Sequence, residues 1–498
     1  MKEESKPKFE SLEIETGNNK IHGNDFHLEQ NIRRNICYFI KKNIIEIISL
    51  TLIFISIGFI IFISLYFNDD WVVKNKEESN NKLLNYSFQA IYKTNKENEN
   101  LQLINKLNFE IIEMIIDNNK IIPSVNYNFS SPGNHSVFFL VNLSNCKSLS
   151  NMFYNIKNLI FINFSSLFNT QNITDMHDMF NGCNSLINID ASHLDTKNVN
   201  DMHNMFANCT SLLSVNLYNF STGNVINMNS MFYNCQKLKS IDLSYFNTEN
   251  VIDLKSIFHK CESLISINLS NFNTKKVMDM SYMFCTCLSL TSLNITNFDT
   301  QKAITMRNMF SNCIKLTSID ISNFKTQNVD DMSFMFANCQ NMRTIDISHF
   351  NTQNVRYMNS MFILCSSLYS INLGKINTIN VINMNSMFSA CSNLKRINIS
   401  NFVTKNVIDM SYMFASCISL TSIDVSSFDT RKVNNMNHIF NNCPLLSYIH
   451  MSSFKTDITS KIIISDFLSD FGIIEVNKDF ISKINTTIPP IWKIIILD

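Results

Sequence analysis

The sequence predicts an α/β repeat fold, namely a solenoid of about twelve 26-residue coils with one transmembrane helix near the N-terminus. Three observations predict it. Most cysteines recur at one fixed spacing, each repeat unit combines an alternating segment with a segment of helical spacing, and a single long apolar stretch precedes the repeats. A fixed period of this size is typical of solenoids, in which each coil buries its apolar face against its neighbours.

The apolar stretch at residues 44–67 predicts a transmembrane signal-anchor helix. Residues 47–67 are 21 positions without a formal charge, and about 20 apolar residues cross the hydrocarbon core. Basic residues precede the stretch and Asp69 and Asp70 follow it, so the positive-inside rule predicts a type II protein with the repeats outside the cell or in a lumen. A cleaved signal peptide is disfavoured because its basic region would be too long.

Composition divides the rest of the chain. Residues 1–43 are polar without apolar period and predict a disordered cytoplasmic tail. We expect a polar stalk at 68–99, an N-terminal cap at 100–150, the solenoid at 151–456 and a C-terminal cap at 457–498. Phe471 and Trp492 are expected to help close the C-terminal end of the array.

The cysteines define the repeat. Eleven of the fourteen cysteines are separated by 26 residues without an insertion. They are Cys183, Cys209, Cys235, Cys261, Cys287, Cys313, Cys339, Cys365, Cys391, Cys417 and Cys443.

Each unit carries two apolar periods. In one unit, residues 240–244 alternate between polar and apolar side chains, which predicts a strand. Val251, Leu254, Phe258 and Cys261 then follow at intervals of three or four, which predicts one or two helical turns. Stacked units would therefore form a parallel strand ladder on one side and short helical segments on the other.

A threonine recurs at one position in all eleven regular units, from Thr196 to Thr456. Its hydroxyl can bond backbone groups of its own or the next coil, so we expect it to fasten the turn. The residue two positions later is usually asparagine, as at Asn198, and could cap the helical segment.

The repeat resembles the BspA-like leucine-rich-repeat surface proteins. Their units carry Met-x-x-Met-Phe-x-x-Cys-x-x-Leu followed by Ile/Leu-Asp-Leu-Ser-x-Phe-x-Thr-x-x-Val, and residues 152–456 are similar to it in many copies. The resemblance implies a leucine-rich-repeat-type solenoid on a cell surface, commonly associated with adhesion, and no enzyme activity or cofactor. Many bacterial members are secreted, wall-anchored or lipid-anchored, whereas this chain has a predicted helix anchor.

The cysteine column has three possible chemistries. Equivalent Cα atoms on neighbouring coils would lie about 4.8 Å apart, within the range that a disulfide bridges. Identical positions offer no unique pairing, however, and free cysteine behaves as a small buried hydrophobe, so a reduced core ladder is favoured. Metal binding is disfavoured because no C-x-x-C pair accompanies the column. Cys285 lies outside the register, and we expect it to point outward and to be reactive.

The centre of each predicted strand carries Asp or Asn, which forms a stripe along the ladder. A solvated strand face is one interpretation, and a surface that binds cations, sugars or basic peptides is the other. Asp320 and Asp346 would be neighbours, which favours a bound cation or a raised pKa in one of them. The stripe comprises Asp190, Asn216, Asp242, Asn268, Asn294, Asp320, Asp346, Asn372, Asn398 and Asp424.

Charge and motifs exclude several function classes. The formal net charge is zero, which argues against a nucleic-acid partner. No nucleophile elbow, metalloprotease helix or phosphate-binding glycine loop is present, so we expect no enzyme, cofactor or metal. Sequons at Asn85, Asn134 and Asn485 fit a glycosylated luminal ectodomain.

These observations favour a membrane-anchored surface protein whose solenoid acts as an adhesion or ligand-recognition scaffold for proteins, glycans or matrix. Two alternatives stay open. One is a structural surface coat, for which uniform repeats are expected. The other is a receptor ectodomain that signals through a partner, since the short tail carries no domain.

Overall fold

The computed structural model describes residues 87–105, 108–455, 462–466, 468–484 and 488–497. All of them belong to one compact unit, residues 82–498. The predicted tail (1–43), the predicted anchor (44–67), most of the predicted stalk, and Asn85 and Asn485 lie outside the described residues. Within the described part of the chain, no helix has the length and apolar character needed to cross a membrane.

The N-terminal cap is antiparallel β-structure. Its strands are β1 (Phe88–Thr94), β2 (Glu99–Gln102), β3 (Glu110–Ile116), β4 (Asn119–Ile121), β5 (Asn126–Phe129) and β6 (Gly133–Asn142). In β1 alternate residues are buried, among them Phe88, Ala90 and Tyr92, because the strand pairs with β6 on one side and β7 on the other. Residues 88–99 therefore belong to the cap, and the predicted stalk boundary at residue 100 is wrong.

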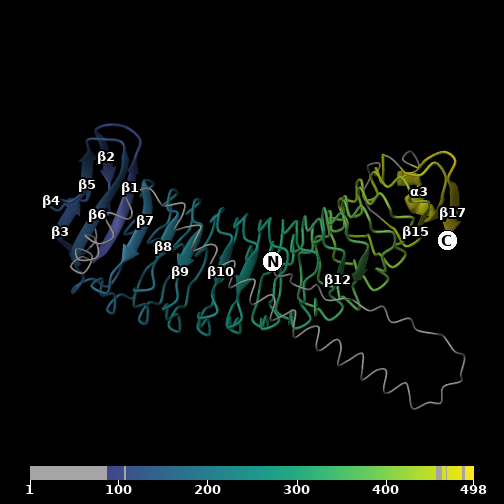
Figure 1. The fold of residues 1–498 in the computed structure, drawn as a ribbon. Helices are drawn as coiled ribbons and strands as arrows, with labels where there is room; N and C mark the ends of the chain where they lie inside the picture. Colours follow the sequence, from purple (N-terminus) through teal and green to yellow (C-terminus); the bar gives the residue numbers. More distant parts are fainter. Residues whose placement is uncertain (1–86, 106–107, 456–461, 467, 485–487, 498) are drawn as a thin grey trace, which may run out of the picture. The chain divides into compact units, whose positions relative to one another are not determined.

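The cap passes into the repeats through β7 (Leu159–Phe164), which is antiparallel to β1 and parallel to the first strand of the coils. The coils then lie side by side in sequence order (Figure 1). Their strands fall at one position of the period: β8 (Asn188–Asp190), β9 (Ser214–Asn216), β10 (Ser240–Asp242), β11 (Ser266–Asn268), β12 (Thr344–Asp346), β13 (Ser370–Asn372), β14 (Ser422–Asp424) and β15 (Tyr448–Met451). The predicted solenoid of about twelve coils is confirmed.

The helical segments predicted within each coil are wrong. In their place each described coil has a run of turns with two residues of positive φ, four positions apart, such as Asn204 at 54° and Asn208 at 59°. A left-handed residue at every fourth position cannot belong to an α-helix. The apolar spacing of three and four residues comes from successive turns that all bury the same side.

The alternation of backbone conformation turns every second amide toward the neighbouring coil. Asn204 and Phe206 donate from their main-chain N–H groups to the carbonyl oxygens of Asn229 and Met231, each over 2.9 Å. The amide of Ala207, between two such donors, instead bonds the carbonyl of Asn204 in its own coil. The turn run thus satisfies backbone groups both within a coil and between coils, which an isolated helix could not do.

Columns of identical side chains fill the interior. Successive phenylalanine rings, from Phe153 to Phe440, stack at centroid distances of 5.3–5.9 Å in an offset arrangement. Methionine, valine and leucine columns beside them are also buried. These columns account for most of the 40 phenylalanines and 25 methionines of the sequence.

The C-terminal cap continues the parallel ladder. Strands β16 (Ile473–Asn477) and β17 (Lys493–Leu497) extend the sheet β14-β15-β16-β17, and α3 (Lys478–Ile484) connects them. Phe480 of α3 packs edge-on against Phe454, the last ring of a second phenylalanine column. Trp492 is buried and donates from Nε1 to the carbonyl of Ser469 over 2.9 Å. Phe471, expected to close this end, is instead 71% exposed.

Candidate binding surface

All eleven cysteines of the regular column are buried as free thiols. Each Sγ donates a hydrogen bond to the main-chain carbonyl of a phenylalanine in the preceding coil, over 3.0–3.3 Å. Burial raises the pKa of these thiols, to about 12 for Cys261 and Cys365. A buried thiol that stays protonated is a poor nucleophile and a poor metal ligand.

Cys285 was expected to face outward, and that prediction is wrong. It is only 5% exposed, and burial raises its pKa. Its Sγ lies 3.6 Å from Thr286 Oγ1, a contact in which either group can donate. The position outside the main register packs against the turn rather than facing solvent.

The threonine column fastens neighbouring coils. Thr300 Oγ1 donates to the carbonyl of Lys325 over 2.9 Å and accepts from the amide of the same residue over 2.7 Å. Equivalent threonines from Thr170 to Thr430 make the donor bond in every described coil.

The asparagine two positions after each threonine does not cap a helix. Asn198 donates from Nδ2 to the carbonyl of Gln171 in the preceding coil over 2.7 Å. Where lysine replaces asparagine, Lys276 and Lys432 reach the Oδ1 atoms of Asn250 and Asn406 one coil back. Both residue types therefore bind the previous coil by a side-chain donor.

The stripe of Asp and Asn residues along the strand ladder, here called the acidic-amide stripe, mostly forms hydrogen bonds within its own turns. In all ten residues Oδ1 accepts a hydrogen bond from the main-chain amide two positions later, as in Asp242 with Ser244 over 2.9 Å. The raised pKa proposed for Asp320 or Asp346 is wrong in direction. Hydrogen bonds from Ser322 and Ser348 hold the pKa of these two carboxyls below its usual range. Nine of the ten side chains are exposed, and Asp190 is half-buried.

A second exposed column, four positions after each threonine, was missed by the sequence analysis. Four consecutive coils place Ile226, Ile252, Met278 and Ile304 here, with exposed fractions of 47%, 39%, 43% and 50%. Their main chains form a ladder in which each amide donates to the carbonyl of the preceding member over 2.8–3.0 Å. We call these four residues the apolar column. Reading the sequence in 26-residue register would have found it.

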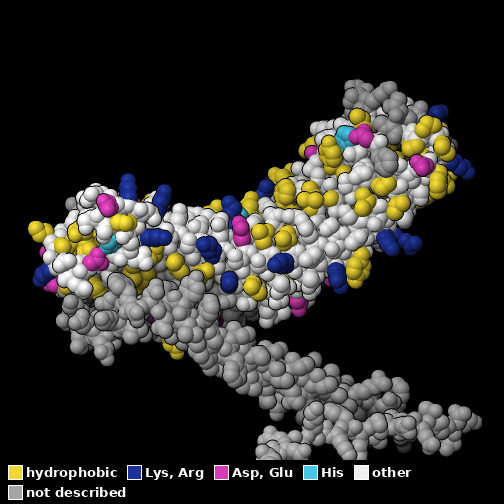
Figure 2. Space-filling view, turned by 45° about the horizontal axis from the view of Figure 1, so that its top comes forward, with side chains coloured by type: hydrophobic (Ala, Val, Ile, Leu, Met, Phe, Trp, Pro, Cys, Tyr) yellow, Lys and Arg dark blue, Asp and Glu magenta, His cyan; other side chains and the backbone are white. Residues whose placement is uncertain are grey.

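Charged side chains flank the apolar column. Lys255, Lys276 and Lys302 are exposed and lie within three residues of a column member, and Arg307 is half-buried. Figure 2 shows hydrophobic side chains scattered along the coils, with both basic and acidic side chains among them. The nearby Asp253 and Asp279 are engaged in turns, since each accepts a main-chain amide two residues on.

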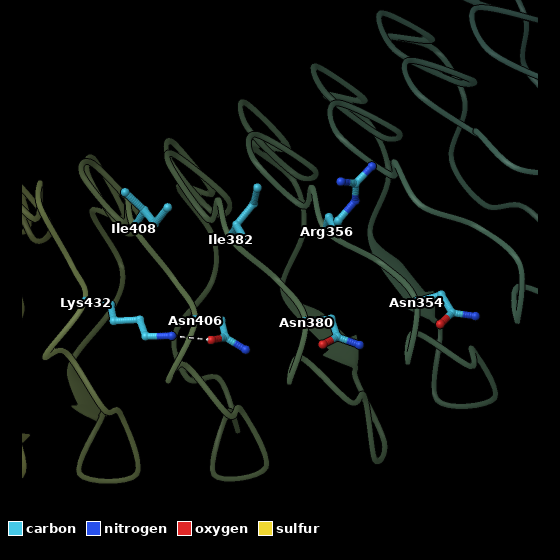
Figure 3. Close-up of a pocket in the computed structure, with 7 residues that line it drawn as sticks. All are labelled: Asn354, Arg356, Asn380, Ile382, Asn406, Ile408 and Lys432. Atoms are coloured by element: carbon cyan, nitrogen blue, oxygen red, sulfur yellow. Dashed lines mark hydrogen bonds between the residues drawn. The ribbon is translucent and has the colours of Figure 1, made fainter.

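Further along the array, the residues four positions after each threonine and those two positions after it line a shallow groove. Ile382 and Ile408 line one side of it with Arg356, and Lys432 and three asparagines line the other (Figure 3). The groove has a volume of about 530 Å³. Arg356 lies at the position of the apolar column and pairs with the carboxylate of Asp330 in the preceding coil. This ion pair separates the apolar column from Ile382 and Ile408.

Asn134, one of the sequon asparagines within the described residues, is exposed in β6. Two histidines that the sequence analysis did not single out, His177 and His203, stack on neighbouring coils with ring centroids 4.6 Å apart. Their spacing of one repeat period was a signal that could have found them.

Comparison with protein families identifies the repeats. The family described as "Mycoplasma protein of unknown function, DUF285" matches overlapping segments at residues 147–267, 212–316, 254–370, 288–395 and 364–463. Together these segments cover more than half of the sequence. The chain belongs to the DUF285 family. The DUF285 segments begin beside the cap and run through the last coil, so they comprise the stacked turn-and-strand units described above.

Several solved structures are similar to this DUF285 chain. A leucine-rich cell surface protein from Faecalibacterium prausnitzii is 15% identical, with a TM-score of 0.32 and coverage of 72% of this chain and 84% of that one. An internalin from Listeria monocytogenes is 14% identical, with a TM-score of 0.19 and coverage of 57% and 83%. A leucine-rich-repeat protein from Leptospira interrogans is 12% identical, with a TM-score of 0.22 and coverage of 62% and 78%. A search of curated protein sequences finds no match.

Proposed function

We propose that this protein is a non-catalytic recognition scaffold that binds a protein partner along the apolar column. Display on the outer side of a membrane belongs to the same proposal and rests on the predicted anchor at 44–67. A relationship to the BspA-like surface proteins, and an adhesive use of the binding face, are further parts of it and rest on the sequence resemblance.

The apolar column is the observation that carries the proposal. Single exposed apolar residues are ordinary on protein surfaces, but here four occupy one position in consecutive coils. Adjacent members of a ladder lie about 4.8 Å apart, so the column extends over roughly 14 Å. Together the side chains expose on the order of 300 Å², a patch size that on monomeric proteins is often functional.

The flanking charges indicate the chemistry of the partner. Lys255 and Lys302 are exposed beside the column, whereas Lys276 donates to Asn250 and Arg307 is paired with Asp331. The fitting partner is therefore a protein segment with apolar side chains at its centre and carboxylates at its edges. A stable interface needs roughly 800 Å² from each partner, so the flanking basic columns must be in contact as well.

Arrays of extracellular matrix proteins, cell-surface proteins and glycans, probed with the purified full-length protein, test this function. The informative variant is I226N/I252N/M278N/I304N, because asparagine already occupies the same column at Asn200 and Asn434 and is compatible with the coil. The matched control is L213T/I265T. It removes exposed apolar side chains from another column, where Thr291 and Thr317 occur naturally.

Binding to protein ligands that the four-residue variant loses at least about tenfold, and the control keeps, supports the proposal. Protein binding that the variant keeps would contradict the role of the column. Binding confined to glycans, or no binding to any array member by a folded protein, would overturn protein recognition and favour a different partner or a structural coat.

A further inference from the structure

The histidine pair near the N-terminal end of the array has a geometry that partner recognition does not use. The rings of His177 and His203 lie parallel, with an interplanar angle of 6°. Asp178 lies beside them, with Oδ2 3.8 Å from His203 Nε2. One ligand atom from each of the three residues falls within 4.8 Å of the others, and all three residues are half-buried.

Each imidazole is oriented by an aspartate of its own coil. His177 Nδ1 lies 2.7 Å from Asp175 Oδ1, and His203 Nδ1 lies 2.7 Å from Asp201 Oδ1. A carboxylate acceptor at Nδ1 favours the tautomer whose proton is on Nδ1, which leaves the Nε2 lone pair free. Histidines that bind metals in proteins almost always donate their other ring N–H in this way.

We propose that His177, His203 and Asp178 form a binding site for a divalent transition-metal ion, with Zn²⁺ as the ion that fits best. Two imidazole nitrogens and one carboxylate oxygen suit Zn²⁺ rather than Ca²⁺ or Mg²⁺, which prefer oxygen ligands. Three protein ligands would leave a fourth tetrahedral position for water. The site is separate from the apolar column and independent of the proposed function.

Closing the site requires side-chain movement. The two parallel rings must rotate toward each other so that both Nε2 lone pairs point at one ion. Ligand atoms that now lie within 4.8 Å of one another must approach to roughly 3.3 Å, the separation around a tetrahedral ion with bonds of about 2.0–2.1 Å. The two coils are already joined at this point, because the amide of Asp178 donates to the carbonyl of His203 over 3.0 Å. An ion held by both coils would cross-link them at the end of the array next to the cap.

The test measures Zn²⁺ binding to the purified full-length protein under reducing conditions by calorimetry, with wild type compared against H177N, H203N and D178N. These variants are expected to fold. Asparagine is natural at the histidine position in other coils, at Asn229, Asn359, Asn385 and Asn437, and at the Asp178 position at Asn204 and Asn308. The control is H193N, because His193 is exposed and lies on a different column.

We expect one Zn²⁺ per chain in the wild type and in H193N, and a loss of affinity of at least about 100-fold in H177N and H203N. D175N, which keeps all three ligands, is expected to weaken binding by about 10–100-fold. The Co²⁺-loaded protein should lack the near-ultraviolet absorption of thiolate ligation, because the cysteines are buried and protonated. Absence of Zn²⁺ binding, an affinity in H177N and H203N equal to that of the wild type, or thiolate absorption would each overturn the proposal.

Discussion

The thiol of Cys235 donates a hydrogen bond to the main-chain carbonyl of Phe206, one coil back, over 3.2 Å. The same carbonyl accepts the amide of Cys209 within its own coil, also over 3.2 Å. Both lone pairs of the oxygen are therefore used, one inside the coil and one between coils. Alanine would fill less of the space and leave one lone pair of a buried carbonyl unpaired, which explains why cysteine occupies this position in every regular unit.

Because the column thiols are buried, we expect the free energy of unfolding to fall as the pH becomes alkaline. Burial raises the pKa of Cys261 and Cys365 from 9.0 to about 12, so between these values the folded state keeps protons that the unfolded state releases. Stability is therefore full below about pH 9 and falls as pH rises toward about 12, by roughly 1.4 kcal/mol per pH unit for each such thiol. Guanidinium unfolding under reducing conditions, between about pH 8 and about pH 11, measures this slope.

A C261A/C365A variant serves as the control for that slope. It should be less stable than wild type at pH 8 because it leaves two cavities, yet its stability should decline less with pH by the contribution of two thiols. A decline of equal steepness in both proteins would show that other groups cause the alkaline loss.

Thr300→Val should destabilise the array strongly although it conserves shape. The change removes both hydrogen bonds to Lys325 and leaves its main-chain amide and carbonyl without that partner. We expect a loss of about 3 kcal/mol, measured as a lower denaturation midpoint. Thr317→Val is the matched control, because Thr317 is exposed and should change stability by less than about 0.5 kcal/mol. Equal effects of the two substitutions would contradict the fastening role of the column.

Leu364→Asn should stabilise the protein. Leu364 has a φ of 62° and is 47% exposed, so it adopts an unfavourable left-handed backbone while burying only about half of its surface. Asparagine tolerates this conformation, and at the equivalent position Asn338 bonds Asn312 Oδ1 over 2.7 Å. The expected gain is about 1 kcal/mol in thermal or chemical unfolding. Leu364→Ala keeps the backbone penalty and should show no gain; a gain as large as that of asparagine would refute the argument from φ.

Asp346 separates the two interpretations of the acidic-amide stripe. Asp346→Asn keeps an Oδ1 acceptor for the amide of Ser348 but loses the Oδ2 acceptor for Asn372, so it should cost less stability than Asp346→Ala, which should cost up to about 1 kcal/mol. Urea midpoints of the two variants make the comparison. If charge rather than turn formation were the purpose of the stripe, the asparagine variant would also lose ligand binding in the array experiment.

The solenoid itself could be predicted because its interior repeats. Cys235 and Cys261 are one period apart, and buried columns require equivalent residues at equivalent positions. The helical interpretation of the intervening segment was wrong because a run of turns and a helix both bury residues three and four apart. The sequence held one distinguishing signal, since Asn204 and Asn208, four positions apart, both tolerate positive φ.

The functional surface could be predicted less well, because which exposed residues form a patch depends on their neighbours in adjacent coils. Ile226 and Ile252 are unremarkable in a linear reading and become a patch only in register. The hydrogen bonds between the two histidines and Asp175 and Asp201 depend on side-chain torsions, which cannot be predicted from the spacing of residues in the sequence. Asp320 was considered from the sequence only as a neighbour of Asp346, although its serine partner lies only two residues away.

The same fastening bond recurs from coil to coil. In each case a threonine hydroxyl donates to the main-chain carbonyl of a residue in the next coil, such as Thr248 to Asn273 and Thr274 to Asp299. Removal of 26 consecutive residues from the middle of the array would therefore bring together two edges that already carry matching donors and acceptors. Removal of another number would shift the columns unless a loop absorbed the difference, as happens between Phe153 and Phe180, which stack although they are 27 residues apart. The length of the array therefore changes most readily in whole coils, each altering its reach by roughly 4.8 Å.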